Sequence, residues 1–129
     1  MSFSTDLGRL VADSLEKVER IDRAIKLELF SSVIKDTPVD TGRARGNWQT
    51  SVSAPKTNTI ERRGEAGSLN EMRNNLGGLD STTYLTNNLP YIEALEHGHS
   101  IQARSPDGMV RKNIARINQI IRQMVNQQS

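Results

Sequence analysis

The chain has 129 residues, 35% of them apolar and 4% aromatic, and a formal net charge of +2. This length fits one domain, and an apolar content below the roughly 45–50% (glycine included) of ordinary domains predicts a modest core with further burial against partner chains. The lack of cysteine excludes disulfides and thiol nucleophiles, the small net charge does not by itself indicate nucleic acid, and no apolar run approaches the ~18 residues of a membrane helix.

The first predicted element is a long helix over residues 6–36. Its apolar residues recur at spacings of three, four or seven, which places them on one stripe of a helix. They are Leu7, Val11, Leu15, Val18, Ile25, Leu29 and Val33. The opposite face mixes acidic and basic side chains, and both a solvated surface and a subunit interface of paired charges fit it. Pro38 disfavours helical geometry at Thr37, so the helix is expected to end there.

Residues 37–48 form a turn-rich segment between this helix and the only tryptophan of the chain. Asp40 and Thr41 are expected to bond local backbone amides, while Gly42 supplies a conformationally permissive position. The structural turn is therefore assigned to Pro38, Asp40, Thr41, Gly42 and Trp48.

The triplet Asp40-Thr41-Gly42 also matches the one found in aspartic proteases, where two carboxylates share a proton. That site requires the triplet inside apolar strands, whereas here a predicted helix end precedes it and two arginines follow. A structural turn is therefore favoured over catalysis. Arg43 and Arg45 are expected to project from the turn as contact residues.

Residues 47–54 alternate large or β-branched side chains with small polar ones, which is the period of a half-buried strand, and Pro55 ends it. Residues 56–67 have little apolar periodicity and end among glycines, so they are predicted to form an exposed loop. Ser68 and Glu71 then make a weak capping box.

That capping box predicts a short helix over residues 69–76. Residues 82–87 are rich in β-branched and aromatic side chains and are predicted to form a second strand. A second short helix is expected from Pro90 through His97, because proline suits the first turn of a helix.

The last predicted helix spans residues 107–126, where apolar residues alternate at spacings of four and three. They are Val110, Ile114, Ile117, Ile121 and Met124. Residues 104–129 carry five basic side chains and one acidic one, so the face of this helix opposite its apolar residues is basic. This basic face could be solvated, could contact an acidic protein surface or could contact DNA, and the sequence leaves these three alternatives open.

This order of elements predicts an α+β domain over residues 1–129, in which long N-terminal and C-terminal helices pack on a small antiparallel sheet with one or two short helices. Trp48 is expected at the junction of helices and sheet. Because an isolated pair of strands is marginal in water, either a third strand forms within residues 56–65 or a neighbouring chain supplies one.

Glu93, His97 and His99 could be drawn as metal ligands, but the glycine between the histidines breaks the helical face that such a site needs. A solvated or interfacial pair is favoured. No nucleophile motif or phosphate-binding loop occurs, so no catalytic residue, cofactor or bound metal is predicted. The first residues lack a basic region followed by an apolar one, which predicts synthesis in the cytoplasm and no membrane partner.

Three groups of motifs follow one another along the chain. Pro38 to Arg43 precedes Gly-x-Trp at residues 46–48, Asn87 to Tyr91 precedes Leu-Glu-x-Gly at residues 95–98, and Gln102-Ala103 precedes Pro106 to Val110. In these motifs, which lie within residues 37–48 and 82–115, the chain resembles the tail-component or tail-completion (neck) proteins of long-tailed bacteriophages. Arg104 and Ser105 look inserted, and His97 stands where an aromatic residue is expected, so the loop before the last helix is altered.

The resemblance implies a structural virion protein, not an enzyme, at the head–tail junction or tail top. It implies a ring around the DNA channel, and tail symmetry favours six copies. The implied partners are other copies of the chain, neighbouring neck and tail proteins and, transiently, DNA. The candidate interface comprises Arg43, Arg45, Asn88, Pro90, Tyr91, His97, Met109, Arg111, Arg116 and Arg122. A small nucleic-acid-binding module that uses the basic last helix is the alternative.

Overall fold

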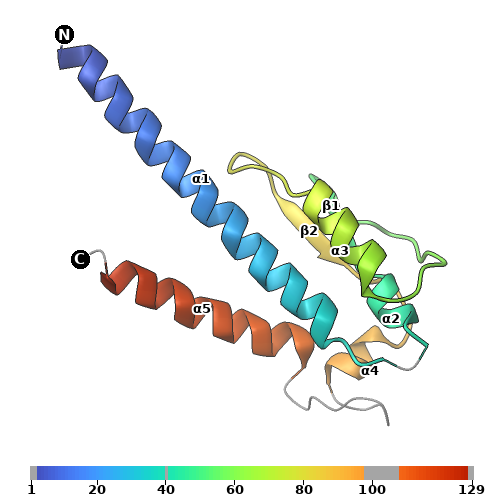
Figure 1. Ribbon diagram of the computed structural model, residues 1–129. Coiled ribbons are helices and arrows are strands. Elements are labelled where there is room, and N and C mark those ends of the chain that lie inside the picture. Colours follow the sequence, from blue (N-terminus) through green and yellow to red (C-terminus); the bar gives the residue numbers. More distant parts are fainter. Residues whose placement is uncertain (1–2, 40, 98–107, 128–129) are drawn as a thin grey trace.

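The computed structural model describes residues 3–39, 41–97 and 108–127 (Figure 1). Its helices are α1 (Phe3–Asp36), α2 (Arg43–Gly46), α3 (Glu65–Asn74), α4 (Ile92–Glu96) and α5 (Met109–Gln127), and its strands are β1 (Gln49–Val52) and β2 (Thr83–Thr86). Two long helices and a small antiparallel sheet confirm the predicted α+β class. The long helices, both strands and the short helix after β2 lie where the sequence predicts them.

The sheet consists of β1 and β2, with Gln49 opposite Thr86 and Val52 opposite Thr83. Within the described residues no third strand forms in the segment 56–65. That part of the sequence prediction is wrong because polar side chains, and not a backbone ladder, bond this segment to its neighbours. A strand supplied by another chain stays a prediction.

The helices pack in an order that the sequence did not predict. α5 lies along α1, and α3 lies against both α1 and β1 (Figure 1). The helix that covers β1 is therefore α3, although α5 was expected there. α4 contacts α5 and so joins the end of the sheet region to the last helix.

One apolar cluster forms where these elements meet. Its buried members are Val33, Ile34, Ala44, Trp48, Leu69, Met72, Leu89, Leu95 and Met109. Trp48 is 5% exposed, as expected for a residue at the junction of helices and sheet. Met109 is 1% exposed, so its place among the candidate interface residues is wrong: its side chain belongs to the core.

The first half of α1 extends beyond this cluster (Figure 1). Every residue from Asp6 to Arg20 is exposed, including Leu7, Val11, Leu15 and Val18. The apolar stripe predicted on this helix is thus buried only in its C-terminal half, around Val33. The pattern of the sequence shows which face is apolar, but it does not show how far the rest of the domain reaches along that face.

α3 begins at Glu65, four residues earlier than the capping box predicted. Gly64, with φ at 80°, precedes the helix and offers no side-chain cap. Ser68 and Glu71 lie inside α3, where their side chains bond other parts of the chain. The proposed capping box is therefore wrong, because both residues make tertiary hydrogen bonds and neither caps the helix.

Candidate interaction surfaces

The segment after α1 is anchored at both of its ends. Thr37 Oγ1 donates to Val33 O at 2.7 Å and accepts from Trp48 Nε1 at 2.8 Å. Gly42 has φ at 80°, a conformation that favours glycine, and its carbonyl accepts from the Gly64 amide at 2.8 Å. Thr41 Oγ1 accepts from the Arg43 amide at 3.4 Å. The residues therefore form an ordered structural turn, while the role predicted for Asp40 lies outside the described residues.

The two arginines of the turn make their contacts within their own chain. Arg45 Nε donates to Thr37 O at 2.7 Å, and its Nη1 lies 3.4 Å from Glu65 Oε2. Arg43 Nη2 lies 4.0 Å from Glu61 Oε1. The expectation that Arg45 projects as a contact residue is wrong, because its guanidinium closes the turn onto the start of α3.

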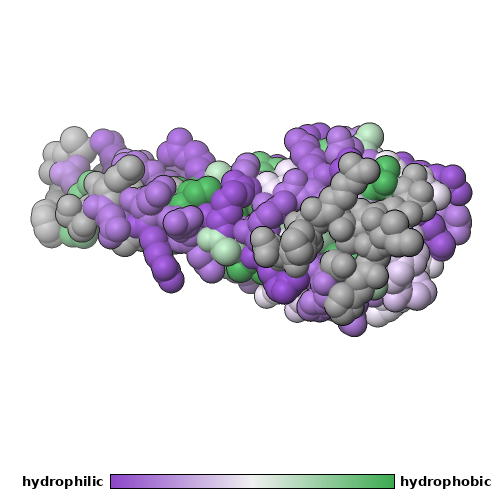
Figure 2. Space-filling view, turned by 90° about the horizontal axis from the view of Figure 1, so that it is seen from below, coloured by the Kyte–Doolittle hydropathy of each residue, from purple (hydrophilic) through white to green (hydrophobic). Residues whose placement is uncertain are grey.

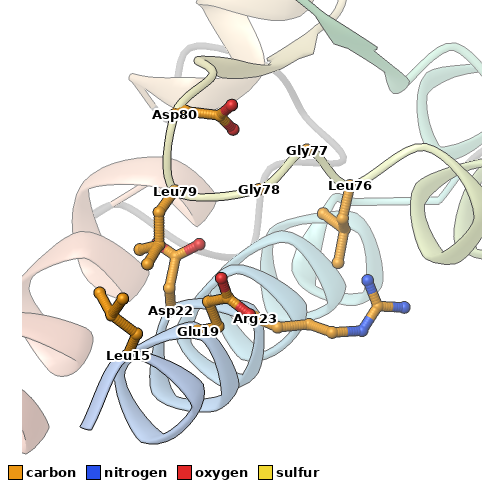
Figure 3. A pocket seen from close by; sticks show the side chains of 9 residues that line it. All are labelled: Leu15, Glu19, Asp22, Arg23, Leu76, Gly77, Gly78, Leu79 and Asp80. Atoms are coloured by element: carbon orange, nitrogen blue, oxygen red, sulfur yellow. The ribbon is translucent and has the colours of Figure 1, made fainter. Parts of the chain in front are cut away.

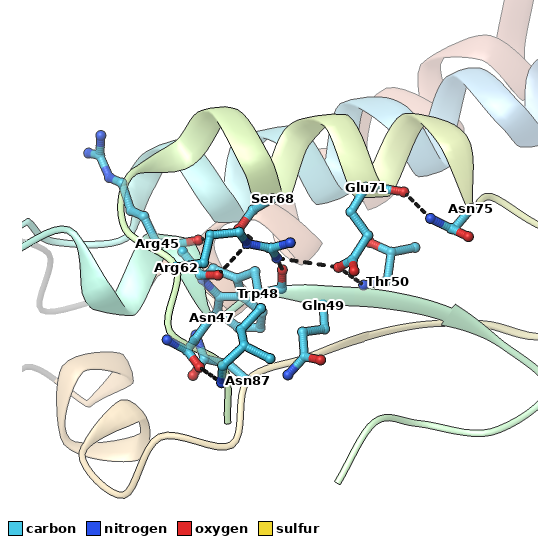
Figure 4. Close-up of polar contacts among 12 residues, drawn as sticks. Arg45, Asn47, Trp48, Gln49, Thr50, Arg62, Ser68, Glu71, Asn75 and Asn87 are labelled. Atoms are coloured by element: carbon cyan, nitrogen blue, oxygen red, sulfur yellow. Dashed lines mark hydrogen bonds and ion pairs between the residues drawn. The ribbon is translucent and has the colours of Figure 1, made fainter. Parts of the chain in front are cut away.

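Arg62 holds the turn, β1 and α3 together (Figure 4). Its Nε donates to Gly46 O at 2.7 Å, and its Nη2 donates to Trp48 O at 2.8 Å and to Ser68 Oγ at 3.2 Å. The same nitrogen lies 3.3 Å from Glu71 Oε1. A guanidinium suits this position because its planar fork presents several donors in fixed directions. Arg62 cannot be singled out from the sequence, because its partners lie elsewhere in the chain.

Glu71 and Arg62 also cover one edge of the sheet. The Thr50 amide donates to Glu71 Oε1 at 3.1 Å, and the Trp48 carbonyl accepts from Arg62. Backbone groups on the outer edge of a strand are the ones to which another strand would add. The Thr50 amide is occupied in this way, so this part of the β1 edge is less open to a strand from a neighbouring chain.

The segment predicted as an exposed loop is tethered. Residues 53–59 are exposed, but the Asn58 carbonyl accepts from Gln49 Nε2 at 2.7 Å and the Ile60 amide donates to Asn47 Oδ1 at 2.9 Å. Asn88 Nδ2 donates to Lys56 O at 2.8 Å. Asn88, a candidate interface residue, therefore holds this segment within the chain.

Pro90 and Tyr91, which follow Asn88, are exposed, as is His97 after α4. The exposure of these three candidate interface residues is compatible with the predicted contact, which stays a prediction. His99 lies outside the described residues, and among those described no cluster of three or more acidic or histidine side chains has the arrangement of a metal site.

Glu96 at the end of α4 caps the start of α5. Its Oε1 accepts from the Val110 amide at 2.9 Å, and its Oε2 accepts from the Arg111 amide at 3.0 Å and from Arg111 Nε at 3.1 Å. Gly108 precedes the helix with φ at 76°, and a Cβ there would collide with the Glu96 carboxylate. Glutamate thus satisfies amides that a capping side chain at residue 108 would otherwise bind. Arg111, predicted as an interface residue, is part of this cap.

Polar contacts join α5 to α1. Lys112 Nζ lies 3.3 Å from Asp36 Oδ2, and Asn113 Nδ2 donates to the same oxygen at 2.9 Å. Arg116 Nη2 lies 2.9 Å from Glu28 Oε1 and donates to Ser32 Oγ at 2.6 Å. The basic side chains of α5 therefore largely pair with acidic side chains of the same chain.

These contacts change the ionisation of Asp36. Burial raises the pKa of its carboxyl group, but hydrogen bonds from Asn113 and Lys112 and the charges of Lys112 and Arg116 outweigh burial, so the pKa lies below its ordinary value of 3.8. The ionised carboxylate is thus the form that the α1–α5 contact favours.

Arg122 is the candidate interface residue of α5 whose exposed side chain makes no hydrogen bond or ion pair within the part of the chain that the structure describes. Arg111, Lys112 and Arg116 all pair with carboxylates. The number of positive charges on α5 therefore overstates the charge that this helix can offer to a phosphate backbone.

A cleft of about 520 Å³ lies between α1 and the loop that leads from α3 to β2 (Figure 3). Leu79 points from that loop toward α1, and Lys26 Nζ fastens the loop by donating to Gly77 O at 3.1 Å. Leu15 and Leu79 are 54% and 44% exposed. The charged residues Glu19, Asp22 and Arg23 also line the cleft, so its surface is mixed and favours no single ligand.

The chain matches no protein-family model, no curated protein and no solved structure. The resemblance to phage tail-completion proteins thus rests on the motifs themselves. Within the described residues, no helix combines the length and apolar content needed to cross a membrane.

Within the described residues, two groups of apolar side chains line open surfaces. We call the exposed row on the first half of α1 the stripe; it consists of Leu7, Leu10, Val11, Leu15 and Val18. We call the hollow between α1 and α5 the groove; it is lined by Ile21, Ala24, Ile25, Ile117 and Ile120, with Arg20 and Glu28 beside them. Seen from below, the narrow end of the molecule shows apolar side chains among hydrophilic ones (Figure 2). Leu10, which the sequence did not single out, is the most exposed member of the stripe at 66%.

Proposed function

We propose that the chain is a structural protein of a phage virion, located at the head–tail junction or the tail top. Copies of it form a ring that completes the tail and helps to join it to the head. The proposal assigns no catalytic role to any residue. Its partners are other copies of the chain and neighbouring neck and tail proteins, and DNA passes through the ring.

The observation that carries this proposal is the stripe. A single exposed apolar side chain on a surface needs no explanation, but a contiguous row marks an interaction site. The five large side chains of the stripe are 42–66% exposed. A protein that works only in an assembly accounts for such a surface.

The phage-like motifs give the assembly its proposed place. The described residues of the first motif form a turn around Gly42 and Trp48. In the second motif, the Asn87 side chain donates to Ala44 O at 2.9 Å and accepts from the Leu89 amide at 3.2 Å. Asn87 of the second motif thus contacts Ala44, which lies between the two parts of the first motif group, and this is expected if the motifs define one structural unit.

Six copies are proposed for the ring because tail symmetry favours that number. The contacts between neighbours are heterologous, since a ring without two-fold axes in its plane brings different surfaces together. Mass photometry of the purified protein tests self-association, and reconstruction of virions tests its place. A protein that stays monomeric in solution and is missing from purified virions would contradict the proposal.

The nucleic-acid-binding module is the weaker candidate, because carboxylates of the same chain pair with three of the basic residues of α5. Arg122 offers a clean test, since it is exposed and free of such pairing within the described residues. Duplex DNA binding that is strong in low salt, and that Arg122→Glu weakens without altering thermal stability, would favour this second candidate.

A further inference from the structure

We propose that the stripe on α1 of one copy docks into the groove between α1 and α5 of the next copy. This inference rests on the proposed self-assembly and names the surfaces that form its contact. Both surfaces are apolar, both are open in the single chain, and each is bounded by charged side chains.

The stripe continues the face of α1 on which α5 already packs. Positions alternate at spacings of four and three along this face, the repeat by which one helix presents a continuous seam to another. They are Leu7, Val11, Ser14, Val18, Ile21, Ile25, Glu28 and Ser32. Glu28 and Ser32 bond Arg116 of α5, and Ile21 and Ile25 line the groove. α5 thus covers the C-terminal part of this row of positions on α1, which we call the seam, and the N-terminal part of the seam is uncovered.

The open half of the seam needs a packing partner. Residues 6–20 are exposed throughout, and helical segments of about 12–15 residues are marginal in water without tertiary contacts. A helix that projects from the domain with an apolar row gains the missing contacts when it lies against another apolar surface.

The groove offers such a surface. Its volume is about 250 Å³, below the ~300–1,000 Å³ of pockets that enclose small ligands. Its walls are aliphatic side chains from two helices, an arrangement that receives the side chains of a third helix. A groove of this kind is suited to leucine and valine side chains from a neighbour.

Charges at the two surfaces are complementary. Asp6 and Asp13 flank the stripe, with Lys17 on the same edge, so this edge keeps a net negative charge. Arg20 stands at the groove, where the other charged residue, Glu28, is paired with Arg116. Asp6, Asp13 and Arg20 form no ion pair with another described residue. Opposite charges around an apolar contact favour one orientation over others, and here they favour a stripe meeting a groove over two stripes meeting each other.

The stripe and the groove are different surfaces, so the contact is heterologous. A linear row of copies joined in this way has a free stripe at one end and a free groove at the other. Such a contact either closes into a ring or extends without limit. A ring is the closed form, which connects this contact to the proposed assembly.

Introduced cysteines test the contact directly, because the natural chain has none. Leu10→Cys places a thiol in the stripe, and Ala24→Cys places one at the groove. The two variants carry tags of different mass, are mixed over a series of concentrations, oxidised and separated without reductant. The matched control is Ala12→Cys, an exposed position on the polar side of the same helix.

We expect the mixed disulfide between Leu10→Cys and Ala24→Cys to exceed every other pairing, and Ala12→Cys to give none above background. Disulfides only between two copies of Leu10→Cys would show that stripes meet each other and would overturn the proposal. The absence of any disulfide at all concentrations would overturn it too.

Sedimentation supplies a second measurement that does not depend on cysteine. Leu10→Glu in the stripe should weaken self-association by roughly tenfold or more, whereas Ala12→Glu should leave it unchanged. Both variants should unfold at the denaturant concentration of the parent, because these residues lie outside the core. Equal effects of the two variants, or flotation of the parent protein with phosphatidylglycerol vesicles that Leu10→Glu abolishes, would contradict docking between copies.

Failure of this contact can be told apart from failure of the proposed function. A ring in virions without the mixed disulfide would leave the function in place and refute the stripe–groove contact. The mixed disulfide in a protein that virions lack would support the contact and refute the virion role.

Discussion

The indole Nε1 of Trp48 donates a hydrogen bond of 2.8 Å to Thr37 Oγ1. Thr37 is the residue that follows α1, and Trp48 is the residue that precedes β1. Both side chains are buried, and the Thr37 hydroxyl also donates to Val33 O. The bond therefore fixes the distance between the end of the long helix and the start of the sheet.

Replacing Thr37 by valine should lower the free energy of unfolding by about 1–3 kcal/mol, because it leaves the buried Trp48 N–H without a partner. Urea unfolding followed by tryptophan fluorescence measures the change. Thr59→Val is the control, since Thr59 is exposed in the tethered segment. If Thr37→Val unfolded at the same urea concentration as the parent, the hydrogen bond would have no structural importance.

Arg62→Lys should cost roughly 2 kcal/mol of stability. A lysine ammonium keeps the charge, but it cannot reach Gly46 O, Trp48 O and Ser68 Oγ together in the directions that the guanidinium supplies. The neighbouring Arg63→Lys is the control, because Arg63 is exposed. Chemical denaturation compares the two, and equal stabilities would show that the Arg62 contacts are dispensable.

The class of fold and most of its elements follow from local patterns. The spacing of apolar residues predicts α1 and α5, alternation predicts β1, and Trp48 is buried as expected. Local patterns also produce the errors. Ser68 and Glu71 fit a capping box by spacing, but the bonds they make to Arg45, Arg62 and Thr50 stabilise them inside α3.

Side-chain partners that are distant in the chain explain what the sequence could not predict of the candidate surfaces. Glu96 lies well before α5 and yet caps it, and no spacing rule connects the two. Arg111 and Arg116 look like free basic residues until their carboxylate partners are known. The exposure of Leu7 and Leu10 depends on where α5 leaves α1, which only the folded chain determines.

Acid should weaken the contact between α1 and α5 through Asp36. The folded state lowers the pKa of this carboxyl group below 3.8, so the ionised form contributes stability that is complete above the ordinary pKa and is lost as the pH falls through the lower, folded value. Unfolding free energies of the parent and of Asp36→Asn, measured from neutral pH downward, should converge in that acidic range. Asp80→Asn, at an exposed site in the loop before β2, is the control. A difference between parent and Asp36→Asn that stays constant with pH would show that Asp36 ionisation does not stabilise the fold.

Glu96→Gln should loosen the first turn of α5. The amide side chain keeps one acceptor oxygen but loses the charge and the second acceptor, and loss of a helix cap typically costs about 1 kcal/mol. Hydrogen exchange at the Val110 and Arg111 amides should accelerate, while Glu93→Gln, at an exposed position of α4, should leave it unchanged. Unchanged exchange in Glu96→Gln would mean that the carboxylate is not the cap.

Charge reversal at α5 separates stability from contact with a partner. Arg116→Glu should destabilise the domain, because it places a second carboxylate beside Glu28. Arg122→Glu should leave the domain stable, because Arg122 makes no such pair within the described residues. Thermal melts of both variants check this order, and the opposite order would mean that the α1–α5 ion pairs are misassigned.

A reconstruction of the intact head–tail region of purified virions tests the central claim most directly. We expect it to place this chain in a closed ring around the DNA channel, in six copies, with the α1 stripe of each copy covered by its neighbour. A reconstruction that places the chain elsewhere, or in single copy, or that finds no density for it in the virion, would contradict the account.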